Sequence, residues 1–304
     1  MVAQIPAVPQ RSPRVAVVGC GYVGTRLSHW LAAAGHTVVA AARQRPEGVA
    51  AAPGRIRPVA VDLDTGAGLT ALAGCDAVVA LHPPPREGER DPRTARLLAA
   101  LGRRPPQRLI YVSTTGVYGD RGGAWVPETA PVAPATDRAR RRWDAEERVR
   151  GFGRRTGTRT AIVRASGIYG PGRLGEDRVR SGQALRVAWP ERRFVSVIHV
   201  DDLVALLHRL LFRGRPGRVY HACDGQPHEQ GALPEATARV LGLDVPDPVF
   251  PAEARATFSA MRLSFLEESR RCDATRTRQE LGWTPAHTDL ETAVRASLDA
   301  SHHP

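Results

Sequence analysis

The chain has 304 residues, 42% of them hydrophobic and 24% charged, which is typical of a globular protein and excludes a disordered or fibrous one. No apolar run reaches about 18 residues. Residues 1–13 also lack the apolar segment of a secretory signal, so we expect a cytoplasmic protein with no membrane partner. All 43 basic residues are arginine, giving a net charge of +12, but no zinc finger, basic zipper or aromatic RNA-binding motif accompanies them, so we expect no nucleic-acid partner.

The first strong pattern along the chain is a βαβ unit. Val15–Val18 is a β-branched run typical of a buried strand, Thr25–Ala34 predicts a helix that Gly35 ends, and Thr37–Ala42 predicts the next strand. Further strands are predicted over Pro58–Val61, Asp76–Leu81, Arg108–Val112 and Thr160–Arg164, and further helices over Gly68–Ala73, Arg93–Leu101 and Asp137–Arg150. This alternation predicts an α/β fold with a Rossmann doubly wound parallel sheet.

The pattern loosens after residue 165. Val195–His199 and Arg218–Ala222 predict two more strands, Asp201 is expected to cap a helix that runs to Leu211, and Ala124–Pro134 is expected to be a surface loop. We predict a dinucleotide-binding Rossmann domain and a smaller, discontinuous, mostly helical C-terminal substrate lobe. The first comprises residues 14–165 with 195–225 completing the sheet, and the second comprises residues 166–194 and 226–304.

Three glycines follow the first strand at G-x-G-x-x-G spacing and open the first helix, which is the context that a dinucleotide site requires. Gly19 permits a tight turn, Gly21 lets the backbone approach a pyrophosphate, and Gly24 lets the helix pack close to the sheet. The helix N-terminus then presents its partial positive charge to the phosphates. The residues expected to bind the dinucleotide here are Gly19, Gly21, Tyr22, Val23 and Gly24. The alternative is a glycine turn in a domain that binds no dinucleotide.

The end of the second strand bears on the choice between NAD and NADP. Arg43 stands where NAD enzymes usually carry an acidic residue that binds the ribose 2′-hydroxyl. A guanidinium binds a 2′-phosphate through two parallel hydrogen bonds, so we expect NADP rather than NAD, with Arg43 as its ligand and Arg45 second. The alternative is a solvated arginine. Asp62, Leu63 and His82 end the next two strands and are also expected at the cofactor, with Asp62 either accepting from the adenine amino group or capping a turn.

Four more motifs follow in order: S-T-T-G-V-Y-G at Ser113–Gly119, R-A-S-G-I-Y-G-P-G at Arg164–Gly172, I-H-V-D-D at Ile198–Asp202 and E-L-G-W-T-P at Glu280–Pro285. With the glycine loop, they resemble the extended short-chain dehydrogenases/reductases, the NAD(P)-dependent epimerase/dehydratase group. The resemblance covers about residues 14–300. It implies a Rossmann fold, a nicotinamide cofactor and hydride transfer.

The resemblance also implies catalytic positions. The family's Ser or Thr three residues before V-Y-G, which holds the substrate oxygen, corresponds to Thr114; the alternative for Thr114 is a turn cap. The family's Tyr-x-x-x-Lys pair falls on Arg138 and Arg142, or in a second register on Thr136 and Arg140. Because arginine does not release a proton at accessible pH, the chain resembles an atypical subgroup without that acid. Arg142 would still bind the nicotinamide ribose.

A replacement proton donor is therefore needed. Tyr118 is our first choice because it lies four residues from Thr114 within the same motif. Tyr169, His82 and His199 are the other residues with a suitable group near the expected cleft. For each of them the alternative is a packing role or a structural hydrogen bond.

The sequence therefore predicts an NADP(H)-dependent enzyme with a non-standard catalytic site that reduces, oxidises or epimerises a small carbonyl or hydroxyl compound. Thr115, Tyr169 and Arg173 are expected to contact this substrate. A redox-neutral isomerase or cyclase, or a non-catalytic NADP-binding regulator, is the alternative. The four cysteines lack C-x-x-C spacing and no common metal-ligand pattern occurs, so we expect no metal. The chain is expected to be a monomer or a homodimer.

Overall fold

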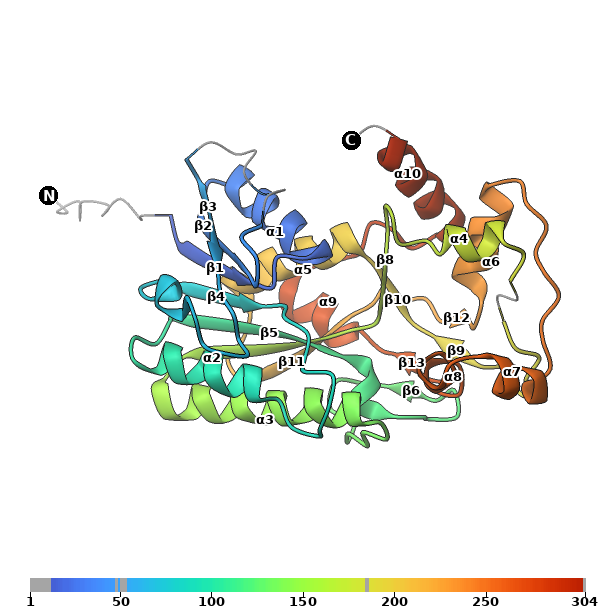
Figure 1. The fold of residues 1–304 in the computed structure, drawn as a ribbon, viewed down its shortest axis with the longest axis horizontal. Coiled ribbons are helices and arrows are strands. Elements are labelled where there is room, and N and C mark those ends of the chain that lie inside the picture. The colour runs from blue at the N-terminus through green and yellow to red at the C-terminus, as the bar shows by residue number, and fades with distance from the viewer. Residues whose placement is uncertain (1–11, 47–48, 50–53, 184–185, 303–304) are drawn as a thin grey trace, which may run out of the picture.

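A parallel sheet forms the centre of the fold in the computed structural model, which describes residues 12–46, 49, 54–183 and 186–302 (Figure 1). The strand order is β11-β7-β5-β4-β1-β2-β3. The strands are β1 (Arg14–Val18), β2 (Thr37–Ala42), β3 (Ile56–Ala60), β4 (Ala77–Ala80), β5 (Arg108–Thr114), β7 (Arg159–Ala165) and β11 (Arg218–Ala222). Every pair in this sheet is parallel, and the chain moves outward in both directions from β1 and β4. The predicted doubly wound Rossmann sheet is confirmed.

Helices cover both faces of this sheet (Figure 1). On one face α1 (Tyr22–Ala33) and α5 (Val200–Arg213) bury Leu27, Leu31 and Leu207 against the strands. On the other face α2 (Pro92–Gly102) and α3 (Asp137–Thr156) bury Leu97 and Phe152. Two short 3-10 turns, η2 (Leu69–Leu72) and η3 (Thr115–Tyr118), follow β3 and β5. Within the part of the chain that the structure describes, no helix combines the length and apolarity needed to cross a bilayer.

Helix α3 is longer than the sequence predicts. Thr136 caps it by accepting a hydrogen bond from the Ala139 amide at 3.2 Å, and it runs through two glycines before ending at Gly157. A Cβ on Gly153 would lie 2.8 Å from the Thr160 side chain on β7, so this glycine lets the helix lie close to the sheet. Gly153, one of the two glycines that indicate a helix end near Arg150 in the sequence, is thus a packing residue inside the helix.

The remaining helices lie mainly at one end of the molecule (Figure 1). They are α4 (Glu176–Arg180), α6 (Ala232–Val240), α7 (Pro251–Thr257), α8 (Ala260–Leu266), α9 (Thr275–Leu281) and α10 (Leu290–His302). Helices α6 and α10 share a separate apolar core with Tyr169 and Val197. Helix α9 differs, because Leu281 and the following Trp283 pack into the core beneath α1 and α5. The segment 226–304 therefore contributes one helix to the packing of the main sheet.

Two predictions about short segments were wrong. The single strand predicted over Val195–His199 is two strands, β9 (Phe194–Val195) and β10 (Val197–His199), neither of which joins the main sheet. Instead β10 pairs with β8 (Gly167–Tyr169), and β9 pairs with β12 (His228–Glu229). Of residues 195–225, only β11 completes the main sheet. The loop predicted over Ala124–Pro134 contains β6 (Trp125–Val126), which pairs with β13 (Arg271–Cys272). Both errors come from pairings between distant residues, which local patterns do not record.

A buried ion pair joins α3 to β7. Both carboxylate oxygens of Glu146 accept from the Arg164 guanidinium, at 3.0 and 2.7 Å, and the two side chains are almost fully buried. Glu146 also accepts from Arg150 at 3.1 Å. Removing one partner of such a pair leaves a buried charge without compensation, which costs more than the pair contributes.

We predict that Glu146→Ala lowers the free energy of unfolding by about 3–5 kcal/mol, because it leaves the buried Arg164 guanidinium unpaired. Glu147→Ala is the matched control, since Glu147 is an exposed partner of Arg150 and its loss should cost below about 1 kcal/mol. Chemical denaturation of both variants measures the difference. Equal losses in the two variants would contradict this account of the pair.

Candidate dinucleotide and active site

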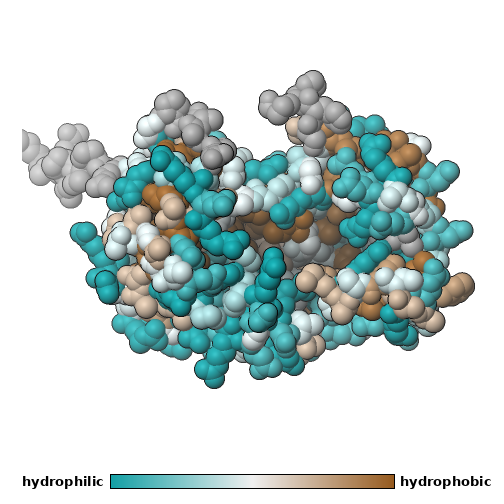
Figure 2. All heavy atoms as spheres, in the orientation of Figure 1, coloured by the Kyte–Doolittle hydropathy of each residue, from teal (hydrophilic) through white to brown (hydrophobic). Residues whose placement is uncertain are grey.

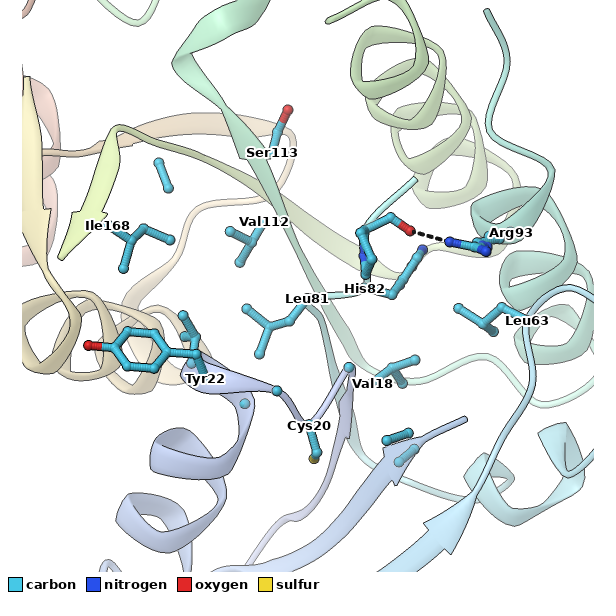
Figure 3. A pocket seen from close by; sticks show the side chains of 18 of the residues that line it. Val18, Cys20, Tyr22, Leu63, Leu81, His82, Arg93, Val112, Ser113 and Ile168 are labelled. Carbon is cyan, nitrogen blue, oxygen red and sulfur yellow. Dashed lines mark hydrogen bonds between the residues drawn. The ribbon is translucent and has the colours of Figure 1, made fainter. Parts of the chain in front are cut away.

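A cavity of about 590 Å³ lies at the carboxyl edge of the sheet, where the chain leaves β1 and β4 in opposite directions. The segments that follow β1, β2, β4, β5 and β7 line it. Figure 2 shows a hollow on this side of the molecule, with apolar residues at its floor and hydrophilic residues around its rim. Figure 3 shows the lining side chains, with the glycine turn below Leu81 and His82. Ligands of open α/β sheets bind at this position.

The glycine turn has the geometry that its spacing predicts. Gly19 has φ +108°, and a Cβ there would lie 2.7 Å from the backbone nitrogen of His82. A Cβ on Gly24 would lie 2.3 Å from the carbonyl oxygen of Gly19, so only glycine lets α1 start this close to β1. A Cβ on Gly21 would meet no atom within 4 Å, because Gly21 borders the open cavity. The turn thus leaves space at Gly21 for a ligand to approach the backbone.

Helix α1 begins without a side-chain cap. Gly21 is its N-cap and has no side chain, and no acidic residue occurs in its first turn. In contrast, Asp91 caps α2 and Thr136 caps α3. His199 caps α5 through Nδ1, which accepts from the Asp201 amide at 3.3 Å, so the prediction of Asp201 as that cap was wrong. The free N–H groups of α1 border the cavity and suit an anion such as a pyrophosphate.

The end of β2 places Arg43 on the cavity wall. Arg43 is exposed and makes no hydrogen bond or ion pair with another residue that the structure describes. The acidic side chain on the same wall, Asp64, is held by Arg93 in a bidentate ion pair with both distances at 2.6 Å. Arg93 holds the pKa of Asp64 below its ordinary value. The local charge facing a ligand is therefore positive.

Asp62 and Leu63 have different roles in the structure. Leu63 lines the cavity, as expected. The Asp62 carboxylate instead accepts from the Asp64 amide at 2.7 Å, which lowers the pKa of Asp62 and shapes the turn after β3. Asp62 is not among the residues that line the cavity, so the structure favours the turn-cap alternative.

Arg142 reaches into the cavity from α3. Its guanidinium donates to the Tyr111 hydroxyl at 3.0 Å, to the His82 carbonyl at 3.1 Å and to the Val112 carbonyl at 3.3 Å. Arg138 lies one turn earlier on α3 and does not line the cavity; its guanidinium lies 3.9 Å from the Phe265 ring centroid. Two alignments of the family's Tyr-x-x-x-Lys positions were considered, Arg138 with Arg142 and Thr136 with Arg140. The first suits this geometry better, because the Thr136 side chain caps α3.

His82 lines the cavity as a neutral histidine. Its Nε2 lies 3.0 Å from the Thr94 hydroxyl, which itself donates to Asp91 at 2.8 Å, so Nε2 carries the proton that Thr94 accepts. Burial is the main cause that lowers the pKa of His82 to about 3. Its Nδ1 has no hydrogen-bond partner among the described residues. The buried Ser113 hydroxyl, which lies above Val112 in Figure 3, also has no hydrogen-bond partner among the described residues.

Thr114 caps the 3-10 turn η3, the alternative role considered for it, and it also lines the cavity. It ends β5, and its oxygen accepts from the Gly116 amide at 3.1 Å. This bond uses an acceptor site and leaves the hydroxyl proton free to donate to a ligand. The neighbouring Thr115, predicted to contact substrate, is buried and does not line the cavity.

Neither predicted tyrosine lies on the cavity wall. The Tyr118 hydroxyl is 2.6 Å from His221 Nε2, and His221 Nδ1 is 2.8 Å from the Asp273 carbonyl. His221 therefore donates from Nδ1 and accepts the Tyr118 proton, and burial raises the pKa of Tyr118 to about 12. The Tyr169 ring packs edge-on against His199 in the core shared by α6 and α10. Their positions do not support Tyr118 as the proton donor or Tyr169 as a substrate contact.

Arg173 does line the cavity, as expected. Its guanidinium lies 4.2 Å from the centroid of the Tyr22 ring, and Arg26 lies at the same distance from that ring.

The charged wall residues that sequence reasoning missed are Asp64 and Arg93, and the missed hydroxyls are Ser113 and Ser166. Ser113 and Ser166 belong to two of the recognised motifs and lie at the ends of β5 and β7, so strand-end position was the available signal. The charged residues lining this cavity are Arg43, Arg93, Arg142, Arg173 and Asp64. This balance suits an anionic ligand.

The glycine turn, the uncapped helix and the strand order define a Rossmann-type nucleotide-binding fold. Residues 15–223 match the model of the NAD dependent epimerase/dehydratase family. The chain belongs to this family. This confirms the resemblance that the motifs indicate.

Two named enzymes are similar to this chain in sequence. The dTDP-glucose 4,6-dehydratase of Mycobacterium tuberculosis is 28% identical over 216 residues, which cover 68% of this chain and 62% of that protein. The chain thus matches under two thirds of the length of that dehydratase. A UDP-glucose 4-epimerase of Azospirillum brasilense is 27% identical over 331 residues, covering 94% of this chain and 91% of that protein.

Solved structures support the fold. A functionally unknown conserved protein from Silicibacter pomeroyi is 29% identical with a TM-score of 0.82, covering 95% of this chain and 99% of that one. The dTDP-glucose 4,6-dehydratase of Bacillus anthracis in complex with NAD has a TM-score of 0.77 at 17% identity, covering 95% and 96% of the two chains. The second likeness is one of fold alone.

The Tyr118–His221 contact predicts a pH dependence of stability. Burial lowers the pKa of His221 from 6.5 to about 4 in the folded state. Between these pH values the unfolded histidine binds a proton that the folded one does not, so stability falls as the pH falls. The loss attributable to His221 is on the order of 3 kcal/mol at pH 4. Denaturation of His221→Gln from pH 8 to pH 4 should show a shallower decline than the original chain. Equal slopes of stability against pH in the two proteins would contradict a neutral, buried His221.

Proposed function

We propose that the chain is an enzyme that binds NADP(H) in this cavity and reduces, oxidises or epimerises a small carbonyl or hydroxyl compound. The observation that carries the proposal is the position of Arg43, which is exposed on the cavity wall at the end of β2 and forms no ion pair with any residue that the structure describes. A 2′-phosphate there would receive two charge-assisted hydrogen bonds. The relatives solved with NAD make NAD the competing cofactor, and the affinity for each dinucleotide decides between them.

The residues of the cavity suit such a dinucleotide. The α1 amides would hold the pyrophosphate, and Leu63 would contact the adenine. Arg142, fixed by three oxygen acceptors, would bind the nicotinamide ribose. Bound NADP(H) supplies or accepts the hydride.

Thr114 orients the substrate in this proposal. Its hydroxyl proton is free to donate to the substrate oxygen, because its own oxygen already accepts from Gly116. Tyr118 is held by His221 within the core. In a reduction, the proton that reaches the alkoxide would therefore come from water entering the cavity, with Arg142 stabilising the developing negative charge.

The absence of the tyrosine acid favours a second candidate, a redox-neutral enzyme or a non-catalytic regulator on the same fold. General acid–base catalysis contributes roughly 100- to 10,000-fold, so its loss is a serious cost to an oxidoreductase. Absorbance at 340 nm distinguishes the two candidates when NADPH is incubated with a panel of aldehydes and ketones. Oxidation of NADPH supports the first candidate, and its absence with every compound supports the second.

We predict that NADPH binds more tightly than NADH and that Arg43→Ala removes roughly 10- to 100-fold of NADPH affinity, because hydrogen bonds to a charged group contribute about 1.5–3 kcal/mol. NADH affinity should stay unchanged. Arg45→Ala is the matched control, since Arg45 is exposed but does not line the cavity. Fluorescence titration of each dinucleotide measures these affinities. Equal affinity of the original chain for NADPH and NADH would refute the proposed preference.

We also predict that Thr114→Val lowers kcat about 100-fold on any carbonyl compound that the panel identifies, with NADPH affinity unchanged. The reason is that valine keeps the shape but cannot donate to the oxygen of the transition state. Tyr118→Phe is the comparison, and it should lower thermal stability while kcat stays within about twofold. A large loss of kcat in Tyr118→Phe with unchanged kcat in Thr114→Val would reverse these roles.

A further inference from the structure

Arg138 is a half-buried cation that makes no hydrogen bond and no ion pair with any residue in the described ranges. Its guanidinium packs over the ring of Phe265 on α8. Arg140, two residues along the same helix, differs: it pairs with Asp137 at 2.7 Å and with Glu89 at 3.5 Å. An unpaired guanidinium that is partly removed from water is costly unless a ligand supplies the missing negative charge.

The surroundings of Arg138 are also positive. Arg141 donates to the Gly88 carbonyl, and Arg142 donates only to carbonyl and phenol oxygens, so neither is neutralised by a carboxylate. The nearby acid, Glu268, is itself paired with Arg270 at 2.7 Å. Arg138 also lies in the first turn of α3, a helix of 20 residues whose N-terminus carries partial positive charge.

Arg138 does not itself line the cavity, but it lies on α3 one turn before Arg142, which does. Residues four apart share a helix face and are separated by about one turn of 5.4 Å. Arg142, four residues on, lines the cavity together with Thr114. The Phe265 ring covers the flat face of the Arg138 guanidinium, which leaves the N–H groups at its edge available. This edge is the part of arginine that binds two oxygens of a carboxylate or phosphate at once.

We propose that Arg138 binds an oxyanion of the substrate, a carboxylate or a phosphate group attached close to the reacting carbon. The inference rests on the proposed function, because it takes Thr114 and Arg142 as the reacting centre. It narrows the substrate to compact anionic carbonyl or hydroxyl compounds, such as 2-oxo acids or phosphorylated aldehydes. In place of the family's tyrosine, the chain then carries a substrate-binding cation.

The test uses oxalate and inorganic phosphate as probes, titrated by calorimetry into the full chain saturated with NADP+. We expect at least one probe to bind, and Arg138→Gln to weaken it roughly 10- to 100-fold. The probe affinity of Arg138→Lys should lie between those of the original chain and Arg138→Gln, since lysine keeps the charge but cannot bind two oxygens at once. Arg140→Gln is the matched control and should bind the probe as the original chain does. Tighter binding of oxalate would indicate that the substrate carries a carboxylate, and tighter binding of phosphate would indicate that it carries a phosphate group.

Two results would overturn the proposal that Arg138 binds the substrate oxyanion. The first is that neither probe binds the original chain. The second is that Arg138→Gln and Arg140→Gln lower the probe affinity equally, which would indicate an effect of general surface charge. Thermal unfolding of each variant shows that it is folded. NADP+ affinity is measured separately in the same proteins. If neither NADP+ nor NAD+ binds, the proposed function fails, and titration of the free protein with the probes still decides the role of Arg138.

Discussion

The close approach of α1 to β1 is the constraint on which the site depends. A Cβ on Gly24 would lie 2.3 Å from the Gly19 carbonyl oxygen, well inside contact distance, so the helix can start where it does only because residue 24 has no side chain. That start brings the uncapped amides of α1 to the point where β1 and β4 diverge. The proposed pyrophosphate site at these amides therefore depends on backbone packing.

The arginines of this chain lie in different electrostatic environments. Arg142 on α3 donates to three oxygen acceptors, which fix the position of its planar guanidinium. Arg164 is neutralised by Glu146 in the core, whereas Arg43 and Arg138 lack described partners. On the cavity wall Arg93 is paired with Asp64, whereas Arg43 makes no ion pair with a described residue.

Local sequence patterns were sufficient for the central sheet and the glycine turn. Each depends on residues close together in the chain: β-branched runs make strands, and glycines at set spacing make one kind of turn. The positions of Arg43 and Thr114 on the cavity wall were also predictable, because residues at the ends of parallel strands meet at one edge. Arg142 lies on α3, and only the family resemblance indicated its position. The short strand pairs β6–β13 and β9–β12 were not, since their partners are far apart in sequence.

Only the tertiary structure decided which side chains face the cavity and which face the core. Tyr118 and Thr114 belong to one motif, but the 3-10 turn after β5 directs Tyr118 toward His221, a residue 103 positions away, and leaves Thr114 at the cavity. The sequence by itself determined the fold, the glycine turn and the absence of lysine. The direction of a side chain at a turn depends on the distant groups that satisfy its polar atoms, and these are known only when the chain is folded.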